Sequence, residues 1–263
     1  MGQILDFFIY AQKRKRSSED YFAFQRYQGR LILRDVRRHI SFGRPLCVLD
    51  IGSGIGGYVY EIAQRTKATV ISLDKNPLKV ALERYRGVSK DKKKMRLPLR
   101  RQANVVFNSE RIAVVEGDIT DAPFKDKSFD IILASSIIEH VHKQKTMLDE
   151  CFRLLKDDGL FYLSFPPYYS PVGGHSISPL HYIPGKFPLW LYRKAHVKGH
   201  ESFKCYGLVK TTIASVKNLV SKKFVIVEVK PRVFGFLKPI VKIPLLCEIL
   251  VYHVEFFLHK KRM

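Results

Sequence analysis

The clearest chemistry in the sequence lies in VLDIGSGIGG, residues 48–57, where an apolar run ends in a carboxylate and passes directly into closely spaced glycines. Glycine has no β-carbon, so a ligand can approach the backbone of such a turn closely. A helix that begins near Gly57 would point unpaired amide groups and the positive end of its dipole into the turn. The stretch therefore predicts a cradle for a nucleotide-containing cofactor.

Two classes of cofactor fit this turn. Gly52, Gly54 and Gly57 match the dinucleotide-binding pattern G-x-G-x-x-G, and Asp74 lies close to the expected distance for an acid that binds ribose hydroxyls. A carboxylate at Asp50, however, would lie near the pyrophosphate of a dinucleotide, where like charges repel. The glycines alone leave both classes open, and Asp50 favours a cationic cofactor.

A second pattern, Gly52, Gly54 and Gly56 with Asp50 two residues ahead, resembles the first motif of the class I S-adenosylmethionine-dependent methyltransferases, of the type 11 group in particular. Three later segments resemble further motifs of that family in the same order: EGDI (116–119), FDIILASSIIEHV (129–141) and LLKDDGLFYLSFP (154–166). The resemblance covers residues 46–165. It implies S-adenosylmethionine as the cofactor and methyl transfer as the activity.

The resemblance also implies which residues contact the cofactor. Asp50 and the glycines of the turn would surround the methionyl end of the cofactor. Asp74 would bind the ribose hydroxyls, and Asp118 with Ile119 would hold the adenine. Ser135 and its neighbour Ser136 would line the cofactor from the fourth strand. The full set expected at the cofactor is Asp50, Gly52, Ser53, Gly54, Gly56, Asp74, Lys75, Asp118, Ile119 and Ser135. For each acid, a plain turn or cap role is the alternative.

Methyl transfer to a hydroxyl acceptor needs a base, and several histidines are candidates. Glu139 and His140 follow the fourth predicted strand, and imidazole titrates near neutrality. Many members of the family carry a Glu-His pair there as a structural element, which is the alternative for His140. Four further candidates come from the long connection after residue 165: His175, His181, His196 and His200. We expect the catalytic group among His140, His175 and His181.

Apolar segments alternate with helical ones through the middle of the chain. The predicted strands are 46–50, 69–73, 112–115, 129–134, 160–165 and 224–229, and the predicted helices are 18–40, 57–65, 77–86, 145–156 and 208–220. Such alternation predicts an α/β, doubly wound, Rossmann-like fold with a mostly parallel sheet and helices on both faces. The family resemblance implies seven strands.

The same reading divides the chain into four parts. Residues 1–44 form an N-terminal helical extension, and residues 45–165 form the cofactor-binding core. Residues 166–206 are rich in proline, aromatic residues and histidine, and the segment is too long for a simple connecting turn. It predicts a lid over the substrate, and a proline-stiffened surface loop is the alternative. Its SFPPYYSPVGGHSISPLHYIP run resembles a lid found in enzymes associated with cell-surface glycan assembly. Residues 207–263 complete the sheet and add an amphipathic extension.

The net charge and the C-terminal residues 242–258 indicate what kind of partner the protein binds. The formal charge of +22 favours an anionic partner, namely nucleic acid, phospholipid headgroups or a phosphorylated substrate, although a solvated basic surface is the alternative. Between residues 242 and 258, apolar residues recur at helical spacing among lysines and glutamates, which excludes a membrane span. This segment predicts either contact with an anionic membrane surface or packing against the sheet.

The remaining features bear on location. The four cysteines are scattered without zinc-ligand spacing, so we expect a reduced, cytoplasmic protein without a metal. The basic cluster at residues 13–16 follows the apolar N-terminal run rather than preceding it, which does not fit a cleaved signal peptide. We expect a cytoplasmic protein with peripheral contact at the inner face of the membrane.

Two functional hypotheses follow. The leading one is an S-adenosylmethionine-dependent methyltransferase that modifies a small or lipid-linked acceptor, a glycan hydroxyl near the membrane. The alternative is an RNA methyltransferase that uses the loop at residues 90–101, which carries seven cations and one acid. Non-catalytic binding and a dehydrogenase are less favoured, and the oligomeric state is left open.

Overall fold

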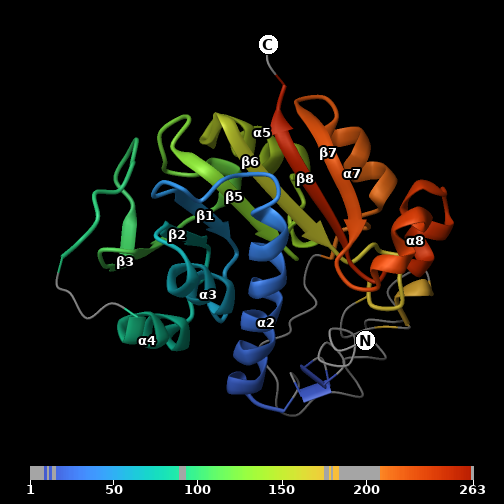
Figure 1. Ribbon diagram of the computed structural model, residues 1–263, viewed down its shortest axis with the longest axis horizontal. Coiled ribbons are helices and arrows are strands. Elements are labelled where there is room, and N and C mark those ends of the chain that lie inside the picture. The colour runs from blue at the N-terminus through green and yellow to red at the C-terminus, as the bar shows by residue number, and fades with distance from the viewer. Residues whose placement is uncertain are drawn as a thin grey trace.

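The computed structural model describes residues 9–10, 12–13, 16–88, 93–174, 178, 180–183 and 208–261. These residues build one eight-stranded sheet with the strand order β3-β4-β2-β1-β5-β6-β8-β7 (Figure 1). The strands are β1 (Cys47–Ile51), β2 (Thr69–Asp74), β3 (Asn104–Asn108), β4 (Ile112–Glu116), β5 (Phe129–Ser135), β6 (Leu155–Phe165), β7 (Phe224–Pro231) and β8 (Val254–Lys260).

Most of the sheet is parallel. Strands β4, β2, β1, β5 and β6 run in one direction, whereas β3 and β8 pair antiparallel with β4 and β6. Because β7 is antiparallel to β8, it runs with the parallel strands. The ends of β1, β2, β4, β5, β6 and β7 therefore share one border of the sheet, which we call the carboxyl edge, and β8 begins there. In open α/β sheets, ligands bind beyond this edge.

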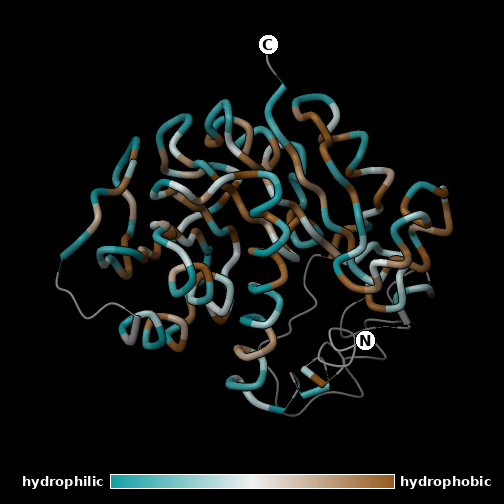
Figure 2. The backbone as a smooth tube through the Cα atoms, viewed as in Figure 1, coloured by the Kyte–Doolittle hydropathy of each residue, from teal (hydrophilic) through white to brown (hydrophobic). Residues whose placement is uncertain are grey.

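Helices cover both faces of the sheet, as predicted. One face packs against α2 (Ser18–Val36), α3 (Gly57–Arg65) and α4 (Lys79–Val88). The other packs against α5 (Gln144–Leu154) and α7 (Ile213–Val220), with α8 (Leu246–Leu250) and the 3₁₀ helices η1 (Ile119–Asp121), η2 (Ile138–His140), η4 (Leu180–Tyr182) and η6 (Gly235–Lys242) in the connections. The hydropathy trace shows the hydrophobic strands in the interior (Figure 2). No helix in these described ranges is long and apolar enough to cross a membrane.

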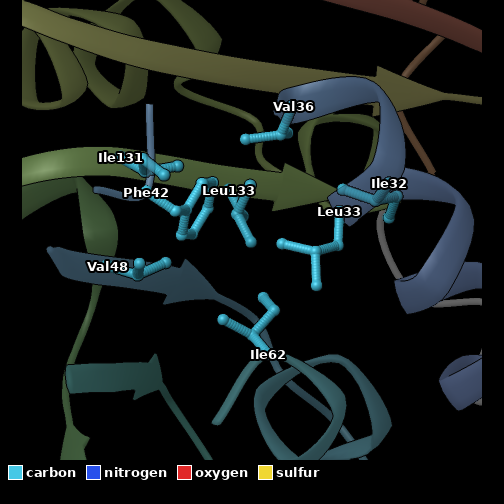
Figure 3. Close-up of a pocket in the computed structure, with 8 residues that line it drawn as sticks. All are labelled: Ile32, Leu33, Val36, Phe42, Val48, Ile62, Ile131 and Leu133. Atoms are coloured by element: carbon cyan, nitrogen blue, oxygen red, sulfur yellow. The ribbon is translucent and has the colours of Figure 1, made fainter. Parts of the chain in front are cut away.

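Helix α2 begins at a side-chain cap and docks through an apolar stripe. The Ser17 hydroxyl accepts a hydrogen bond from the amide of Asp20 (3.0 Å), and acidic residues in the first turn complement the helix dipole. Its buried stripe faces side chains of β1, β5 and α3 across a gap lined only by apolar groups: Ile32, Leu33, Val36, Phe42, Val48, Ile62, Ile131 and Leu133 (Figure 3). This lining offers no polar group to a ligand, so the gap is a packing contact.

Two parts of the fold differ from the sequence-based expectation. The segment at residues 88–110, in which no strand is predicted, contributes β3, an eighth strand at the border of the sheet. Its apolar run is only three residues long, too short to separate a strand from a loop by pattern. Within residues 243–258 the chain is helical at α8 only, whereas Val254 and Phe257 belong to β8 and are fully buried. The helical reading of 242–258 is thus wrong beyond Leu250, because a short continuous apolar run fits helix and strand equally.

Candidate cofactor and acceptor site

Three glycines between β1 and α3 adopt a backbone conformation that other residues rarely take. The φ angles of Gly52, Gly54 and Gly56 are 71°, 54° and 85°. A β-carbon on Gly52 would lie 2.7 Å from Cδ1 of Ile137, and one on Gly56 would overlap the ring of Tyr85. Glycine is therefore required here both for the left-handed backbone and for close packing.

The turn is closed by its own backbone and by β2. The amide of Gly56 donates to the carbonyl of Ser53 (2.9 Å), and the amide of Gly52 donates to the carbonyl of Leu73 (2.9 Å). The hydroxyl of Ser53 is buried and accepts a hydrogen bond from the Ser72 hydroxyl (2.7 Å). These bonds fix the shape of the turn, so Ser53 contributes to the site through the backbone that it holds.

The start of α3 differs from the cradle expected for a phosphate. The amide of Gly57, the first of the helix, donates to Oε1 of Gln25 in α2 (2.9 Å), and the amide of Gly54 donates to Oδ2 of Asp74 (3.2 Å). The expectation of unpaired amides at this helix start is therefore wrong for Gly57. A pyrophosphate binds through such amides, so their occupation by protein groups disfavours a dinucleotide.

The carboxyl group of Asp50, on β1, is buried beside the glycine turn. Its exposed fraction is 2%, and within the described part of the chain its Oδ2 has no hydrogen-bond partner. Burial, and then repulsion from Asp74, raises the pKa of Asp50 to about 7. Leaving a buried polar atom unpaired costs about 1–3 kcal/mol, and a positively charged ligand group placed against Oδ2 would remove that cost. The residues at this turn thus fit a cofactor with a cationic end.

Asp74 is held over the same turn by backbone donors. Its Oδ1 accepts from the amide of Asn76 (2.9 Å), while its Oδ2 accepts from the turn. It lies in register with Glu116 at the end of β4, and the amide of Gly117 donates to the carbonyl of Asp74 (3.0 Å). The structure therefore brings the ends of β2 and β4 against the glycine turn, where a ligand can span them.

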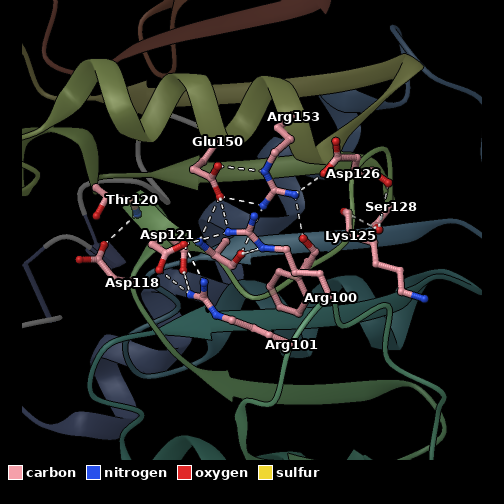
Figure 4. Close-up of polar contacts among 12 residues, drawn as sticks. Arg100, Arg101, Asp118, Thr120, Asp121, Lys125, Asp126, Ser128, Glu150 and Arg153 are labelled. Carbon is pink, nitrogen blue, oxygen red and sulfur yellow. Dashed lines mark hydrogen bonds and ion pairs between the residues drawn. The ribbon is translucent and has the colours of Figure 1, made fainter.

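Asp118 follows β4 and caps η1. Its Oδ1 accepts from the amide of Thr120 (2.9 Å), and its Oδ2 lies 2.9 Å from Nζ of Lys75 (Figure 4 shows the first of these contacts). Burial alone would raise the pKa of Asp118, but the donors Lys75 and Thr120 outweigh it and lower that pKa. Ile119 follows and is buried. An ionised acceptor and an apolar side chain thus lie at adjacent positions, as an adenine site requires.

The serines at the end of β5 are bonded to protein groups. Oγ of Ser135 accepts from Nη2 of Arg232 (2.9 Å) and from the hydroxyl of Ser164 (3.2 Å). Oγ of Ser136, whose φ is 55°, lies 3.0 Å from Nε2 of His253. These bonds fix Ser135 at the end of β5, on the carboxyl edge.

Arg232, which follows β7, is a buried centre of this edge that sequence reasoning missed. Its side chain is 1% exposed, and Nε donates to Oε1 of Glu255 (3.1 Å). Nη2 also donates to the hydroxyls of Tyr162 (2.9 Å) and Ser164, and the Tyr162 hydroxyl donates to Glu255 (2.6 Å). The partners lie 23 to 97 residues away in the sequence, so no local pattern could have revealed the cluster.

The described histidines among the candidate bases lie in contrasting environments. His140 ends η2 and is exposed. His181 lies in η4, is buried, and packs against the rings of Tyr168 and Tyr182 with centroid separations of 5.5 and 4.0 Å. Three candidates lie outside the described residues: His175, His196 and His200. No cluster of metal ligands occurs within the described ranges.

One segment connects the turn that carries His140 with the aromatic loop after β6. The amide of Val209 donates to the carbonyl of Glu139 (2.7 Å), and the amide of Tyr168 donates to the carbonyl of Thr211 (2.8 Å). The structure thus places both sides of a candidate acceptor site next to residues 209–211. These contacts hold the two loops at the carboxyl edge.

Comparisons with known proteins agree with this geometry. A family model described as a methyltransferase domain matches residues 49–163. The chain is 31% identical over 163 residues to an uncharacterized methyltransferase of Mycolicibacterium vanbaalenii, which covers 62% of this chain and 54% of that protein. It is 29% identical over 187 residues to an uncharacterized methyltransferase of Mycobacterium leprae, which covers 70% and 61%. The chain thus spans little more than half the length of the curated relatives it matches.

Solved structures share the fold at low sequence identity. A protein of Pyrococcus horikoshii OT3 aligns with a TM-score of 0.56 at 16% identity, over 90% of this chain and 92% of that one. The phosphoethanolamine N-methyltransferase 2 of Haemonchus contortus, solved with phosphomonomethylethanolamine and S-adenosylhomocysteine, aligns with a TM-score of 0.56 at 17% identity, over 88% and 52%. Residues 49–163 thus match a methyltransferase domain, and the solved structures share the fold of the chain.

Proposed function

We propose that the protein transfers a methyl group from S-adenosylmethionine to a small or lipid-linked acceptor. The observation that carries the proposal is the buried Oδ2 of Asp50, which has no partner among the described residues and borders a turn of left-handed glycines. S-adenosylmethionine carries a cationic amino-acid end that would complement this carboxylate. The presence of S-adenosylhomocysteine in a solved structure of the same fold supports the cofactor class.

Each acid of the site has a separate role in this proposal. Asp50 orients the amino-acid end, Asp74 accepts from the ribose hydroxyls, and Asp118 with Ile119 positions the adenine. The cofactor, when bound, supplies an electrophilic methyl group on a positively charged sulfur. The remaining task of the chain is to hold the acceptor on the methyl axis and to exclude water.

The acceptor side is suited to a sugar hydroxyl. The rings of Tyr168, Tyr169 and Tyr182 offer stacking surfaces beside buried His181, and Nζ of Lys210 lies 4.7 Å from the ring centre of Tyr169. A hydroxyl acceptor would pass its proton to a histidine, and we propose His140, His175 or His181 for this role. An acceptor attached to a lipid would bring the protein to the cytoplasmic membrane face.

The pKa of Asp50 makes cofactor affinity depend on pH. Below pH 7 the carboxyl is mostly protonated and loses the charge that attracts the cofactor, so affinity should fall as pH falls. We expect the dissociation constant of S-adenosylhomocysteine to be about tenfold higher at pH 6 than at pH 8. Titration calorimetry across this range measures the change, and the Asp50→Asn variant should show a flat profile. A flat profile for the wild-type protein would contradict the role of Asp50.

The RNA alternative loses part of its support in the structure. Arg100 and Arg101 of the basic loop both bond to Asp121, at 2.8 and 2.6 Å, and Arg153 pairs with Asp126 and Glu150 beside them (Figure 4). Cations engaged in this way would have to exchange these acids for phosphates. Lys93, Lys94 and Arg96 remain exposed, but the loop is less basic in effect than its composition indicates.

The transfer of labelled methyl groups into fractionated host extract tests the acceptor class. Label from S-adenosylmethionine should enter a glycolipid or polysaccharide fraction when the purified protein is added, and the Asp50→Asn variant should give a much weaker signal at the same cofactor concentration. Label found in RNA alone would overturn the proposed acceptor and favour the alternative. RNA binding can then be confirmed by its steep decrease with salt.

A further inference from the structure

The connection between β7 and β8 exposes a concentration of large apolar side chains. Half of the twelve exposed large hydrophobic residues in the described part of the chain lie in η6 and α8 or between them: Phe236, Ile243, Leu245, Leu246, Ile249 and Leu250. The exposed fractions reach 71% at Phe236 and 77% at Leu245. Figure 2 shows this stretch, at the right of the view, largely in the hydrophobic colours. A patch of this kind on a protein surface marks an interaction site.

The backbone presents these residues rather than hiding them. Leu245, between the two helices, has a φ of 65°, a conformation unfavourable for a side chain of this size. Its side chain nevertheless points into solvent, so no burial in the described structure compensates for the conformation. Strained residues of this kind cluster at binding surfaces.

The exposed charges within residues 235–250 have one sign. Glu248, the only acid at residues 235–250, is turned inward and accepts from the amides of Ile213 and Ala214 at the start of α7 (2.8 and 2.9 Å). Lys242 is exposed, and Lys238 is 59% exposed although it contacts Glu228. Residues 235–250 thus present apolar and basic groups and no exposed carboxylate of their own, which complements an anionic lipid surface. Two copies of a chain with a charge of +22 would repel each other across the same patch.

The patch also lies where a lipid-linked acceptor would need it. Since β7 runs with the parallel strands, η6 begins at the carboxyl edge, the edge that carries the glycine turn and the ends of β5 and β6. Figure 1 shows α8 beside the arrowhead end of β7, at the right of the view. A membrane bound at η6 and α8 would therefore bring its surface to the side of the sheet on which the candidate site opens.

We propose that η6 and α8 form a docking surface for an anionic phospholipid bilayer, in which Phe236 and Leu245 enter the headgroup boundary and Lys242 contacts lipid phosphates. The contact is peripheral, because η6 and α8 are far shorter than a membrane span. The docking surface deepens the proposed function, since it gives a lipid-linked substrate its route to the site, but binding to lipid alone does not depend on methyl transfer.

Flotation with phosphatidylcholine vesicles, with and without phosphatidylglycerol, tests the surface. The wild-type protein should float with the anionic vesicles and much less with phosphatidylcholine alone, and added salt should weaken binding. The double variant Phe236→Ser/Leu245→Ser should bind the anionic vesicles at least about tenfold more weakly than the wild-type protein, because it removes the apolar contacts. The control is Val225→Ser, which alters an apolar side chain that is 48% exposed at the opposite end of β7 and should bind like wild type.

Three results would overturn the docking surface: absent binding to anionic vesicles, equal binding by the double variant, or a wild-type dimer in gel filtration that the double variant abolishes. The last would assign the patch to a second copy of the chain. Calorimetry with S-adenosylhomocysteine on the same samples separates this failure from that of the proposed function. A protein that binds the cofactor but not the vesicles refutes only the docking surface.

Discussion

Replacing Arg232 by methionine should lower the free energy of unfolding by about 3 kcal/mol or more. The substitution keeps most of the apolar volume but removes the donor to Glu255, a buried carboxylate that lies 3.4 Å from Lys230 and shares a hydrogen bond with Tyr162. Ser135 and Ser164 would lose a donor as well. Urea denaturation followed by circular dichroism measures the loss.

The Arg100→Met variant provides the matched control. Arg100 pairs with Asp121 at the surface, where such a contact contributes at most about 1 kcal/mol. Combining Arg232→Met with Glu255→Gln should recover part of the stability, since the buried charge that then has Lys230 as its remaining ion-pair partner is removed as well. If Arg232→Met is as stable as Arg100→Met, the buried cluster does not hold the carboxyl edge together.

Asp50→Asn should weaken the binding of S-adenosylhomocysteine by about 10- to 100-fold, the effect expected for a hydrogen bond to a charged group. Asparagine preserves the shape of the side chain but removes the negative charge beside the glycine turn. The substitution should not lower the stability of the folded protein. Because burial raises the pKa of Asp50 from 3.8 to about 7 on folding, the fold loses stability as the pH rises between these two values, and the variant removes that penalty. Calorimetry at pH 8 gives the affinity, and thermal unfolding without ligand gives the stability.

Asp118→Asn is the appropriate comparison for this variant. Asp118 is 39% exposed and already bonded to Lys75, so its loss should reduce affinity less than the loss of Asp50. Equal affinity of the Asp50→Asn variant and the wild-type protein would show that the buried carboxylate does not contact the cofactor. A large drop in thermal stability would instead make the loss of binding a folding effect.

Much of the core fold could be predicted from the sequence because buried parallel strands appear as continuous apolar runs. Strands β1, β2, β4 and β5 lie within two residues of their predicted positions, as do α3 and α4. The prediction is wrong where the pattern is short or ambiguous. The brief apolar run of β3 gave no signal within a basic segment, and β8 matched helical spacing by coincidence.

Some residues of the candidate site could likewise be predicted from the sequence, and others could not. Acids that directly follow strands could be predicted, because parallel strands carry their ends to one edge, and the structure brings Asp50, Asp74 and the end of β4 together there. Groups that come from distant segments could not. Gln25 reaches the start of α3 across 32 residues, and Arg232 reaches Ser135 across 97. Side-chain packing between separate elements decides these contacts, and no local spacing records it.

We expect the glycine turn to hold the cationic donor S-adenosylmethionine rather than a dinucleotide. Titration calorimetry of the wild-type protein with S-adenosylmethionine, S-adenosylhomocysteine and NAD in turn tests it most directly. The structure predicts saturable one-to-one binding of the first two and none of NAD, since Asp50 repels a pyrophosphate and Gln25 occupies the amide of Gly57. Binding of NAD without binding of S-adenosylmethionine would contradict it.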